Sequence, residues 1–330
     1  MRKFEGYNRG VNFGGWLSQC DHTKERYDTF ITEKDFANVS GREFDHVRIP
    51  VDYDLFLNKD FSVKEEGFGY IDFAIEMCKK YNLNMILDLH RTPGYSFDPF
   101  HGEKGFFESD EYQKVFYFIW TEFAKRYSKY HEFLTFELLN EVTKKEYCDK
   151  WNEIAKNCIK IIREYSSDIR IIVGGYYNNS LEAVKDLEAP YDDKIIYTFH
   201  CYEPLLFTHQ GAYWIETMDT SFRCDYKMPF SKYEELSQKY LCQAYASFKD
   251  KDPNECPDER FFEKLFEEAI QVSKDRDVPL YCGEYGVIDR ADKNEAVKWF
   301  HDFHAIADKY NIGRCVWNYK EMDFEIDQNF

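Results

Sequence analysis

The stretch LTFELLNE, residues 134–141, decides the fold class of this chain. Its apolar, β-branched and aromatic residues are typical of a short strand that is buried on both faces. It ends in the polar pair Asn140-Glu141. Parallel α/β barrels carry their active sites at such strand ends. The stretch therefore predicts a buried parallel strand with a candidate site at its carboxyl end.

Seven further runs share this character. They span residues 9–16, 46–51, 84–90, 170–175, 195–202, 279–286 and 314–320. Helical patterns lie between them: Thr32 and Asp35 form a capping-box pattern, and Ser109 and Asp292 can each cap a helix. Strand and helix alternate around eight strands, which predicts an α/β fold, a closed (β/α)8 TIM barrel. The alternative, an open doubly wound sheet, usually has a Gly-rich phosphate turn, and residues 14–16 lack its spacing.

We expect one catalytic domain over residues 1–330, with an inserted subdomain after the sixth strand. The interval between the sixth and seventh runs is the longest, and residues 205–260 fill it. Loops that follow barrel strands lie at the catalytic face, so this inserted segment is predicted to be a lid or a cleft wall. A surface insertion without a function is the alternative. Few residues follow the eighth run, so we expect the last helix to be truncated.

The charge of the chain excludes several classes of partner. It has 61 acidic and 43 basic residues, a net charge of −18. Nucleic-acid phosphates and anionic lipids repel such a chain, so we expect neither nucleic acid nor a membrane as a partner. A neutral polysaccharide fits, and an aromatic content of 19% supplies rings for a sugar-binding cleft as well as for the core. We expect a monomer.

The ten cysteines include no metal-type C-x-x-C pair and are interpreted as reduced thiols. A metal-dependent barrel hydrolase would need clustered ligands such as H-x-H on an early strand. The sequence has no such cluster, so we expect no metal and no cofactor. The first residues lack the apolar core of a signal peptide. Two locations stay open: the cytoplasm, or secretion with a signal that has been removed.

Polar and aromatic candidates lie at the ends of six of the eight runs. They are Arg48, His90, Asn140 with Glu141, His200 with Tyr202, Glu284, and Trp317. The carboxyl ends of barrel strands meet at one face, so we expect these side chains to converge. Structural roles are the alternative: His90 and His200 could be core histidines, and Arg48 could pair with the buried Glu137.

Glycoside cleavage requires two carboxylates across the scissile bond. The fourth and seventh strands lie on opposing sides of an eight-stranded barrel, so Glu141 and Glu284 can face each other across its mouth. A separation of ~5 Å would give retention through a covalent glycosyl-enzyme. We predict that Glu141 is the acid/base and Glu284 the nucleophile, which Arg48 and Tyr202 hold ionised.

Other side chains are candidates for binding the sugar. Asn140 can hydrogen-bond a sugar 2-hydroxyl, a contact that strengthens in the transition state. Trp317 offers a flat platform under the reacting sugar. We add Trp16 from the Gly-Gly-Trp opening, and His209 and Trp214 from the inserted segment, as candidate substrate-binding residues.

Seven stretches that span nearly the whole chain carry a resemblance to a known family. They are RGVNFGGW (9–16), HVRIP (46–50), LDLH (87–90), FELLNE (136–141), HCY (200–202), GEYGV (283–287) and VWNYK (316–320). In this order they resemble glycoside hydrolase family 5, whose acid/base and nucleophile lie on strands four and seven of a barrel. The family usually has Pro after Asn-Glu, where this chain has Val142. Valine there, and FTHQ at 207–210, are similar to the clostridial endoglucanase C type of cellulase.

The resemblance implies endo-acting hydrolysis of β-1,4-glucan, extending to mixed-linkage β-1,3-1,4-glucan such as lichenan. The Gly-Gly-Trp opening is also similar to exo-β-1,3-glucanases of the same family, which are the alternative function. A carbohydrate-binding protein on an inactive barrel would have lost one carboxylate, and this chain has both Glu141 and Glu284.

Overall fold

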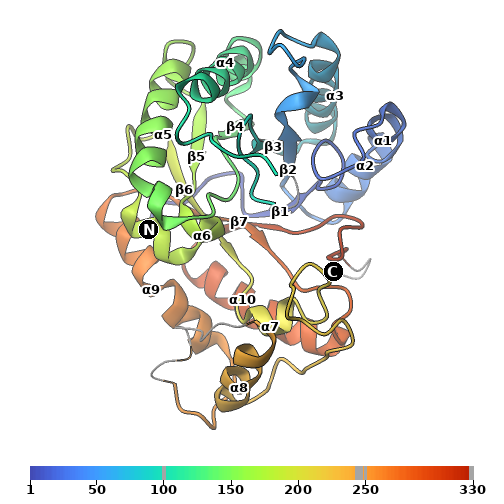
Figure 1. The fold of residues 1–330 in the computed structure, drawn as a ribbon, viewed down its shortest axis with the longest axis vertical. Helices are drawn as coiled ribbons and strands as arrows, with labels where there is room; N and C mark the ends of the chain where they lie inside the picture. Colours follow the sequence, from blue (N-terminus) through green and yellow to red (C-terminus); the bar gives the residue numbers. More distant parts are fainter. Residues whose placement is uncertain (99–101, 242–247, 249–250, 327–330) are drawn as a thin grey trace.

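The computed structural model describes residues 1–98, 102–241, 248 and 251–326. Eight parallel strands close into one barrel in the order of the sequence, which confirms the predicted (β/α)8 fold (Figure 1). The strands are β1 (Arg9–Asn12), β2 (His46–Asp52), β3 (Asn84–Arg91), β4 (Leu134–Glu137), β5 (Arg170–Val173), β6 (Ile195–Cys201), β7 (Leu280–Tyr285) and β8 (Gly313–Val316). Five of the eight, β2, β4, β6, β7 and β8, are buried along their whole length, as expected for strands covered on both faces.

Four of the predicted runs continue two or more residues past the strands that they contain. The run 9–16 continues past the end of β1 at residue 12, 134–141 past the end of β4 at residue 137, 170–175 past the end of β5 at residue 173, and 314–320 past the end of β8 at residue 316. Beyond β4 the chain reaches Glu141 with a φ of 49°, a left-handed conformation that no strand accommodates. The predicted ends of these four strands are therefore wrong, because local turns override the apolar pattern.

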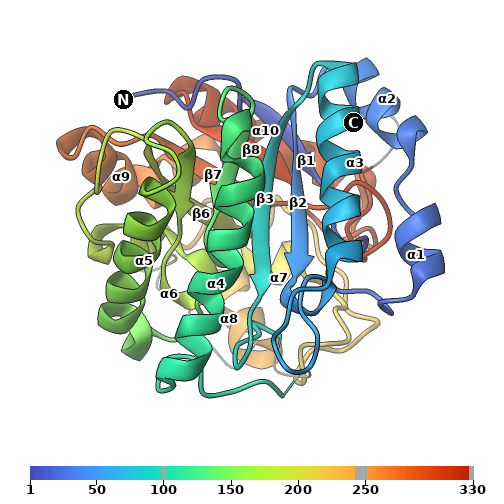
Figure 2. The same cartoon turned by 90° about the horizontal axis from the view of Figure 1, so that it is seen from above.

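Helices cover the outside of the barrel, and α3, α4 and α5 lie beside the strands (Figure 2). The α-helices are α1 (Lys24–Thr29), α2 (Glu33–Gly41), α3 (Glu65–Tyr81), α4 (Asp110–Tyr127), α5 (Cys148–Arg163), α6 (Tyr176–Asn179), α7 (Leu205–Thr208), α8 (Phe230–Tyr240), α9 (Glu259–Asp275) and α10 (Lys293–Lys309). Short 3-10 turns are η1 (Tyr53–Leu55), η3 (Ser128–Tyr130), η4 (Lys145–Tyr147) and η5 (Leu181–Asp186). None of the helices in the described ranges has the length and apolar character needed to cross a bilayer.

The predicted helix caps are present. Thr32 and Asp35 form a capping box at the start of α2, and Ser109 accepts a hydrogen bond from the backbone N–H of Tyr112 at the start of α4. Asp292 accepts from the first turn of α10. Each cap satisfies backbone donors that the helix itself cannot pair, and this fixes where the chain turns from loop into helix.

The inserted segment carries α7 and α8 and leads into α9, so its last residues belong to that helix. It lies at the end of the barrel toward which the arrowheads of β2 and β3 point (Figure 2). It is attached to α10, because Tyr226 donates from its hydroxyl to Asp302 at 3.0 Å and from its backbone to Glu295 at 2.9 Å. Residues 242–247 and 249–250 of this segment lie outside the described residues. Its role as a lid or cleft wall stays a prediction.

The seam between β1 and β8 is closed by side chains as well as by strand pairing. The amide Nδ2 of Asn12 lies 3.1 to 3.3 Å from the carbonyl oxygens of Gly283, Cys315 and Val316. No helix follows β8 in the described residues up to Ile326. The chain instead turns back, and Asn318 pairs with Phe324 and Ile326 through backbone hydrogen bonds of 2.9 Å.

The amino-terminal segment plugs the opposite end of the barrel. Phe4 and Tyr7 stack with ring centroids 4.1 Å apart and form a buried cluster with apolar residues of β3, β5, β6, β7 and β8. The hydroxyl of Tyr7 donates to the carbonyl of Phe133 at 2.7 Å. Gly313 makes this close packing possible, because a Cβ there would lie 2.0 Å from the carbonyl oxygen of Tyr7.

Gly313→Ala should lower the free energy of unfolding by about 1–3 kcal/mol, because the added methyl group forces β8 away from the plug. Urea denaturation followed by tryptophan fluorescence measures the change. Gly41→Ala is the matched control, since a Cβ at Gly41 would meet nothing within 4 Å. If both variants lost the same stability, the packing of Tyr7 against β8 would not be the cause.

Candidate active site

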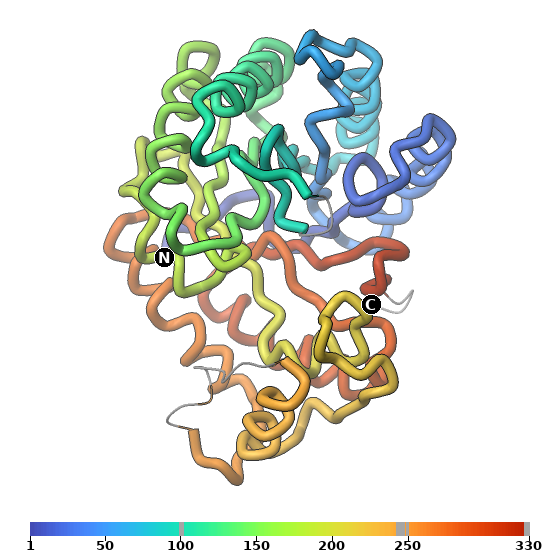
Figure 3. Tube along the Cα trace, in the orientation of Figure 1, coloured from blue at the N-terminus to red at the C-terminus, as the bar shows by residue number. Residues whose placement is uncertain are grey.

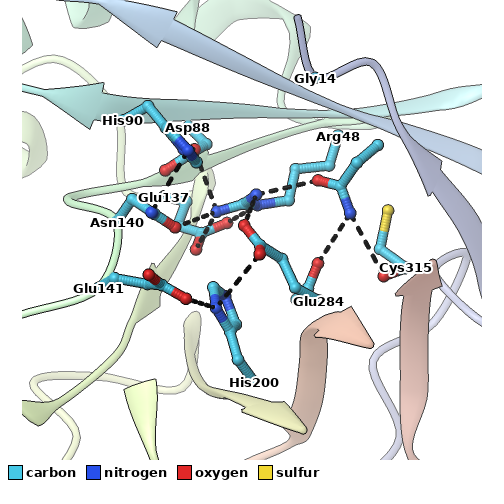
Figure 4. Close-up of polar contacts among 12 residues, drawn as sticks. Gly14, Arg48, Asp88, His90, Glu137, Asn140, Glu141, His200, Glu284 and Cys315 are labelled. Carbon is cyan, nitrogen blue, oxygen red and sulfur yellow. Dashed lines mark hydrogen bonds and ion pairs between the residues drawn. The ribbon is translucent and has the colours of Figure 1, made fainter. Parts of the chain in front are cut away.

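Arg48 of β2 is the centre of the site. Its side chain is completely buried. It holds Glu137 of β4 with two hydrogen bonds, of 2.7 and 3.0 Å, and Glu284 of β7 with one of 2.9 Å (Figure 4). Asn12, Asn140 and Asp88 complete its contacts at 2.9 to 3.0 Å. One guanidinium therefore ties together five strands, which a planar fork of donors is suited to do.

Three carboxyl groups share this single cation. Burial disfavours the charge on Arg48, but Asp88, Glu137 and Glu284 outweigh burial and raise its pKa above the ordinary value. Burial raises the pKa of Glu137 and brings that of Asp88 to about 7. Asp88 therefore takes up a proton near neutral pH, and this leaves more of the Arg48 charge for the other two carboxylates.

Glu141 and Glu284 face each other from β4 and β7, as predicted. One oxygen of each lies within 4.8 Å of the other, and only 8% and 5% of these residues is exposed. His200 of β6 lies between them, with its Nδ1 atom 2.7 Å from Glu141 and 3.6 Å from Glu284 (Figure 4). The site thus brings two carboxylates to the short separation that a direct attack on a sugar would need.

The surroundings of the two carboxylates differ. Burial raises the pKa of both. At Glu284 this rise is opposed by His200 and by Arg48, which donates directly to the carboxylate at 2.9 Å, and the hydroxyl of Tyr202 donates to the same carboxylate at 2.9 Å. Glu141 instead accepts from the neutral amide of Asn178 at 2.9 Å and contacts His200. Glu284 is therefore the better stabilised anion, and Glu141 is the group that keeps a proton more readily.

His90 and His200 are neutral, since burial lowers the pKa of each to about 4. The Nδ1 atom of His90 lies 2.6 Å from Asp88, and its Nε2 lies 3.4 Å from the amide nitrogen of Asn140. The Nε2 of His200 lies 3.3 Å from the amide nitrogen of Asn179. With these amides as donors, each imidazole donates from Nδ1 to a carboxylate. His200 contacts Glu141, and His90 contacts Asn140 beside it, so both histidines belong to the site and not only to the core.

Trp317, just after β8, lies against the same group. Its ring is parallel to that of His90 at a centroid distance of 6.0 Å. Gly14 makes room for it, since a Cβ there would lie 2.5 Å from the indole. Trp317 is largely buried, with 7% of the residue exposed.

Trp16 does not belong to the site, and its prediction as a substrate-binding residue is wrong. Its side chain is completely buried, its ring packs edge-on against Phe73 of α3, and its Nε1–H donates to the carbonyl of Tyr27 at 2.9 Å. Gly15 has a φ of 76°, which turns the chain away from the barrel mouth before the tryptophan. The Trp16 ring is part of the core between the barrel and α3.

His209 and Trp214 lie behind Tyr202. The ring of His209 is 5.1 Å from that of Tyr202 and 6.0 Å from that of Trp214. Phe324 completes this aromatic cluster at 5.1 Å from His209. Figure 3 shows the yellow trace of the inserted segment beside the dark red C-terminal segment that carries Phe324. The inserted segment thus supports the residue that donates to Glu284.

Four contributors to the site were not predicted: Asn12, Asp88, Asn178 and Asn179. Asp88 lies within the recognised LDLH stretch, but its apolar neighbours gave it the character of a strand residue. Asn178 and Asn179 follow β5, a strand without a polar candidate at its end, and have φ values of 58° and 55°. Asparagine is one of the few residues that tolerates this conformation, so the pair Asn178-Asn179 was the available signal for a turn.

Three groups of side chains in the described residues have ligand atoms close enough to hold a cation. They are Glu141 with His200 and Glu284, His22 with Asp52 and Asp54, and Glu259 with His301 and Asp302. A protein cation already contacts each group: Arg48 at Glu284, Arg91 at Asp52 and Asp54, and Lys227 at Asp302. The charge that a metal would supply is therefore present in the protein.

An eight-stranded barrel with two facing carboxylates at the ends of β4 and β7, one of them held by a buried arginine, defines a glycoside hydrolase of the barrel type. A family model described as Cellulase (glycosyl hydrolase family 5) matches residues 7–323. The chain belongs to this family.

Relatives and solved structures agree with this placement. Over 314 residues the chain is 41% identical to cellodextrinase A of Ruminococcus flavefaciens, covering 95% of this chain and 86% of that protein. It is also 41% identical over 323 residues to endoglucanase C of Acetivibrio thermocellus, covering 97% and 93%. Among solved structures, the cellulose synthase subunit Z of Clostridioides difficile superposes with a TM-score of 0.77 at 26% identity, covering 97% and 94%. Endoglucanase Cel5A of Thermotoga maritima gives 0.76 at 25%, covering 97% and 91%.

Tyr202→Phe should move the acidic limb of the kcat/KM profile to higher pH by about half to one unit, because the hydroxyl stabilises the ionised form of Glu284. The profile on an aryl β-cellobioside measures this shift, since its acidic limb reports a group that must be ionised in the free enzyme.

Tyr197→Phe is the control for this variant. It removes a hydroxyl that donates to the carbonyl of Glu188, away from both carboxylates, and should leave the limb in place. An unmoved limb in Tyr202→Phe would contradict the role given to this hydroxyl.

Proposed function

We propose that this protein is a retaining endo-β-glucanase. It hydrolyses β-1,4 bonds in cellulose-type and mixed-linkage β-1,3-1,4 glucans by double displacement. The observation that carries this proposal is the approach of Glu141 and Glu284 to within 4.8 Å. Retaining glycosidases hold their carboxyl groups about 5–5.5 Å apart, whereas inverting enzymes leave roughly 6.5–9.5 Å for a water molecule.

In the first step, an oxygen of Glu284 bonds to the anomeric carbon while the bond to the leaving sugar breaks. Glu141 gives its proton to the leaving oxygen. The contacts of Glu284 with Arg48 and Tyr202 support this assignment, because they favour the anion that attacks. Glu141 has neutral partners, and burial favours its protonated form.

In the second step, Glu141 is a carboxylate and takes a proton from water. The water oxygen bonds to the anomeric carbon while the bond to Glu284 breaks, so both carboxyl groups regain their starting states. His200 contacts both groups and is neutral, so it can orient Glu141 in each protonation state without adding charge.

The reacting sugar is placed by Asn140 and Trp317. The Oδ1 atom of Asn140 accepts from Arg48 at 2.9 Å, which turns its amide nitrogen away from Arg48 and makes it a donor to the 2-hydroxyl. Trp317 lies over His90 and would support the apolar face of the same sugar. His209 packs against Tyr202, and Trp214 packs against His209, so both support Tyr202 rather than contact the sugar in this proposal.

The preference for β-1,4 and mixed linkages is supported by the names of two relatives, an endoglucanase and a cellodextrinase. The alternative, an exo-β-1,3-glucanase, was suggested by the Gly-Gly-Trp opening. Trp16 of that opening is buried in the core and Gly14 makes room for Trp317, so the motif serves packing and favours no linkage.

Glu284→Ala should lower kcat on barley β-glucan by about 10⁴-fold or more, because no other group can form the covalent intermediate. Glu141→Ala should impair natural glucans strongly but spare the glycosylation step of dinitrophenyl cellobioside, which needs no proton on its leaving group. Steady-state and burst kinetics measure both effects.

Glu203→Gln is the matched control for these two variants. Glu203 is a carboxyl at the same end of the barrel, and its contact is with the backbone of Leu205, so activity should be retained. Equal losses on both kinds of substrate would contradict Glu141 as the acid. First release of the α-anomer, seen by proton NMR, would contradict double displacement.

Substrate choice tests the linkage. We expect rapid loss of viscosity from carboxymethyl cellulose and barley β-glucan with little sugar released from laminarin, because an endo-acting enzyme cuts within the chain. Viscometry and reducing-sugar assays on the same enzyme measure the two activities. Glucose release from laminarin with unchanged viscosity of the other two would instead support the exo-β-1,3 alternative.

A further inference from the structure

The short segment α6 (Tyr176–Asn179), which follows β5, is a left-handed turn rather than a regular α-helix. Tyr177, Asn178 and Asn179 are consecutive and have φ values of 50°, 58° and 55°. Side chains disfavour this left-handed conformation, and a tyrosine there is a genuine outlier. Residues kept in such a conformation are concentrated where a protein needs a side chain in one particular place, so the turn invites a functional explanation.

The surrounding structure holds this turn in place. The backbone N–H of Asn178 donates to the carbonyl of Val142 at 3.0 Å, and that of Asn179 donates to Gly175 at 3.2 Å. Asn179 is completely buried, and Gly174 leaves the room that its amide occupies, since a Cβ there would lie 2.2 Å from Oδ1. The turn is therefore a fixed part of the barrel mouth next to the residue that follows Glu141.

The turn places two exposed side chains beside the acid/base candidate. Asn178 is exposed, yet its amide donates to Oε2 of Glu141 at 2.9 Å. The neighbouring Tyr177 is 50% exposed, and its ring stands at 90° on the buried ring of Tyr176 at 5.0 Å. Tyr177 directly precedes Asn178, and consecutive Cα atoms are ~3.8 Å apart. The Tyr177 side chain therefore leaves the backbone next to the residue that contacts Glu141.

We propose that this turn forms the leaving-group side of the cleft: Tyr177 stacks on the sugar beyond the scissile bond, and Asn178 positions the oxygen of Glu141 that delivers the proton. The inference rests on the proposed function, in which Glu141 is the acid/base. It assigns Tyr177 to substrate binding and makes Asn178 a positioning residue.

The two oxygens of Glu141 indicate on which side of this residue the leaving sugar lies. Oε1 faces inward to His200 at 2.7 Å, whereas Oε2 faces the exposed Asn178. The acid protonates the oxygen of the departing sugar, so the proposal puts that sugar against Oε2, the oxygen on the side of the exposed Asn178. From there it continues past Asn178 and Tyr177. A tyrosine ring has an apolar face and a polar tip, which matches the C–H face and hydroxyl edge of a glucosyl unit.

Asn178 also affects the charge of Glu141. Its N–H group favours the ionised form and lowers the pKa of Glu141, against the larger effect of burial. The other titratable or charged groups near Glu141 come from four strands and the loops that follow them. They are Arg48 from β2, Asp88 and His90 from β3 with Tyr95 after it, His200 from β6 with Tyr202 after it, and Glu284 from β7. All of these remain in an Asn178 variant, so a change of the pH profile would report the missing amide.

The first test compares the kcat/KM of Tyr177→Ala on two substrates. We expect kcat/KM to fall at least about fivefold on a tetrasaccharide, which fills the leaving-group side, and less than about twofold on cellobiosyl fluoride, which does not. Tyr177→Phe should restore most of the loss, because the ring remains. Tyr191→Ala is the control: Tyr191 is 45% exposed and lines a groove beside α5.

Equal losses on both substrates, or none on the tetrasaccharide, would overturn the assignment of Tyr177. The tetrasaccharide used is a β-glucan fragment that the wild-type enzyme cleaves, whatever its linkage. If the enzyme prefers a linkage other than β-1,4 or mixed β-1,3-1,4, the proposed function is contradicted, but the comparison of Tyr177→Ala with wild type stays valid.

The second test is the pH profile of Asn178→Ala. The basic limb of kcat/KM should move to higher pH by about half to one unit, since the removed donor favoured the ionised acid. A merely structural role would lower the rate without moving the limb. A limb that stays in place, or moves to lower pH, would overturn the positioning role of Asn178.

Discussion

The rest of the structure depends on one buried cation, Arg48. Its completely buried guanidinium meets carboxylates from β3, β4 and β7, and amides from β1 and from the segment after β4. Such a cation is costly to bury without partners, and the carboxylates are costly to bury without the cation. The fold and the site therefore depend on each other, because the strands must meet in this register for the charges to be compensated.

Around this centre, small differences between similar groups produce different chemistry. Glu141 and Glu284 are equally enclosed, and both have raised pKa values because of burial. Only Glu284 receives donors from Arg48 and Tyr202. Amide and neutral imidazole partners at Glu141 orient it without fixing its charge. In the proposed mechanism this difference makes Glu284 the anion and Glu141 the acid.

The sequence was sufficient for those features that depend on burial and spacing. Apolar runs located all eight strands, and reading their last residues found Glu141, Glu284, Arg48 and the histidines, because barrel geometry brings strand ends together. Backbone conformation was not readable in this way. The sequence does not reveal that Gly15 turns Trp16 into the core, or that Tyr177 to Asn179 fold in a left-handed turn over Glu141. Such positions are decided by contacts between distant segments, which no local pattern records.

The amide of Asn12 affects how the protein can lose its structure and its activity. It bonds to carbonyls of β7 and β8 while its oxygen accepts from Arg48, so one side chain joins the first strand, the last strands and the central cation. Partial opening at this seam would disconnect Arg48 and the strand of Glu284 together, and would leave two unpaired strand edges able to recruit other chains. A barrel frayed at its seam would thus be inactive and prone to aggregate at once, without passing through a weakened but soluble enzyme.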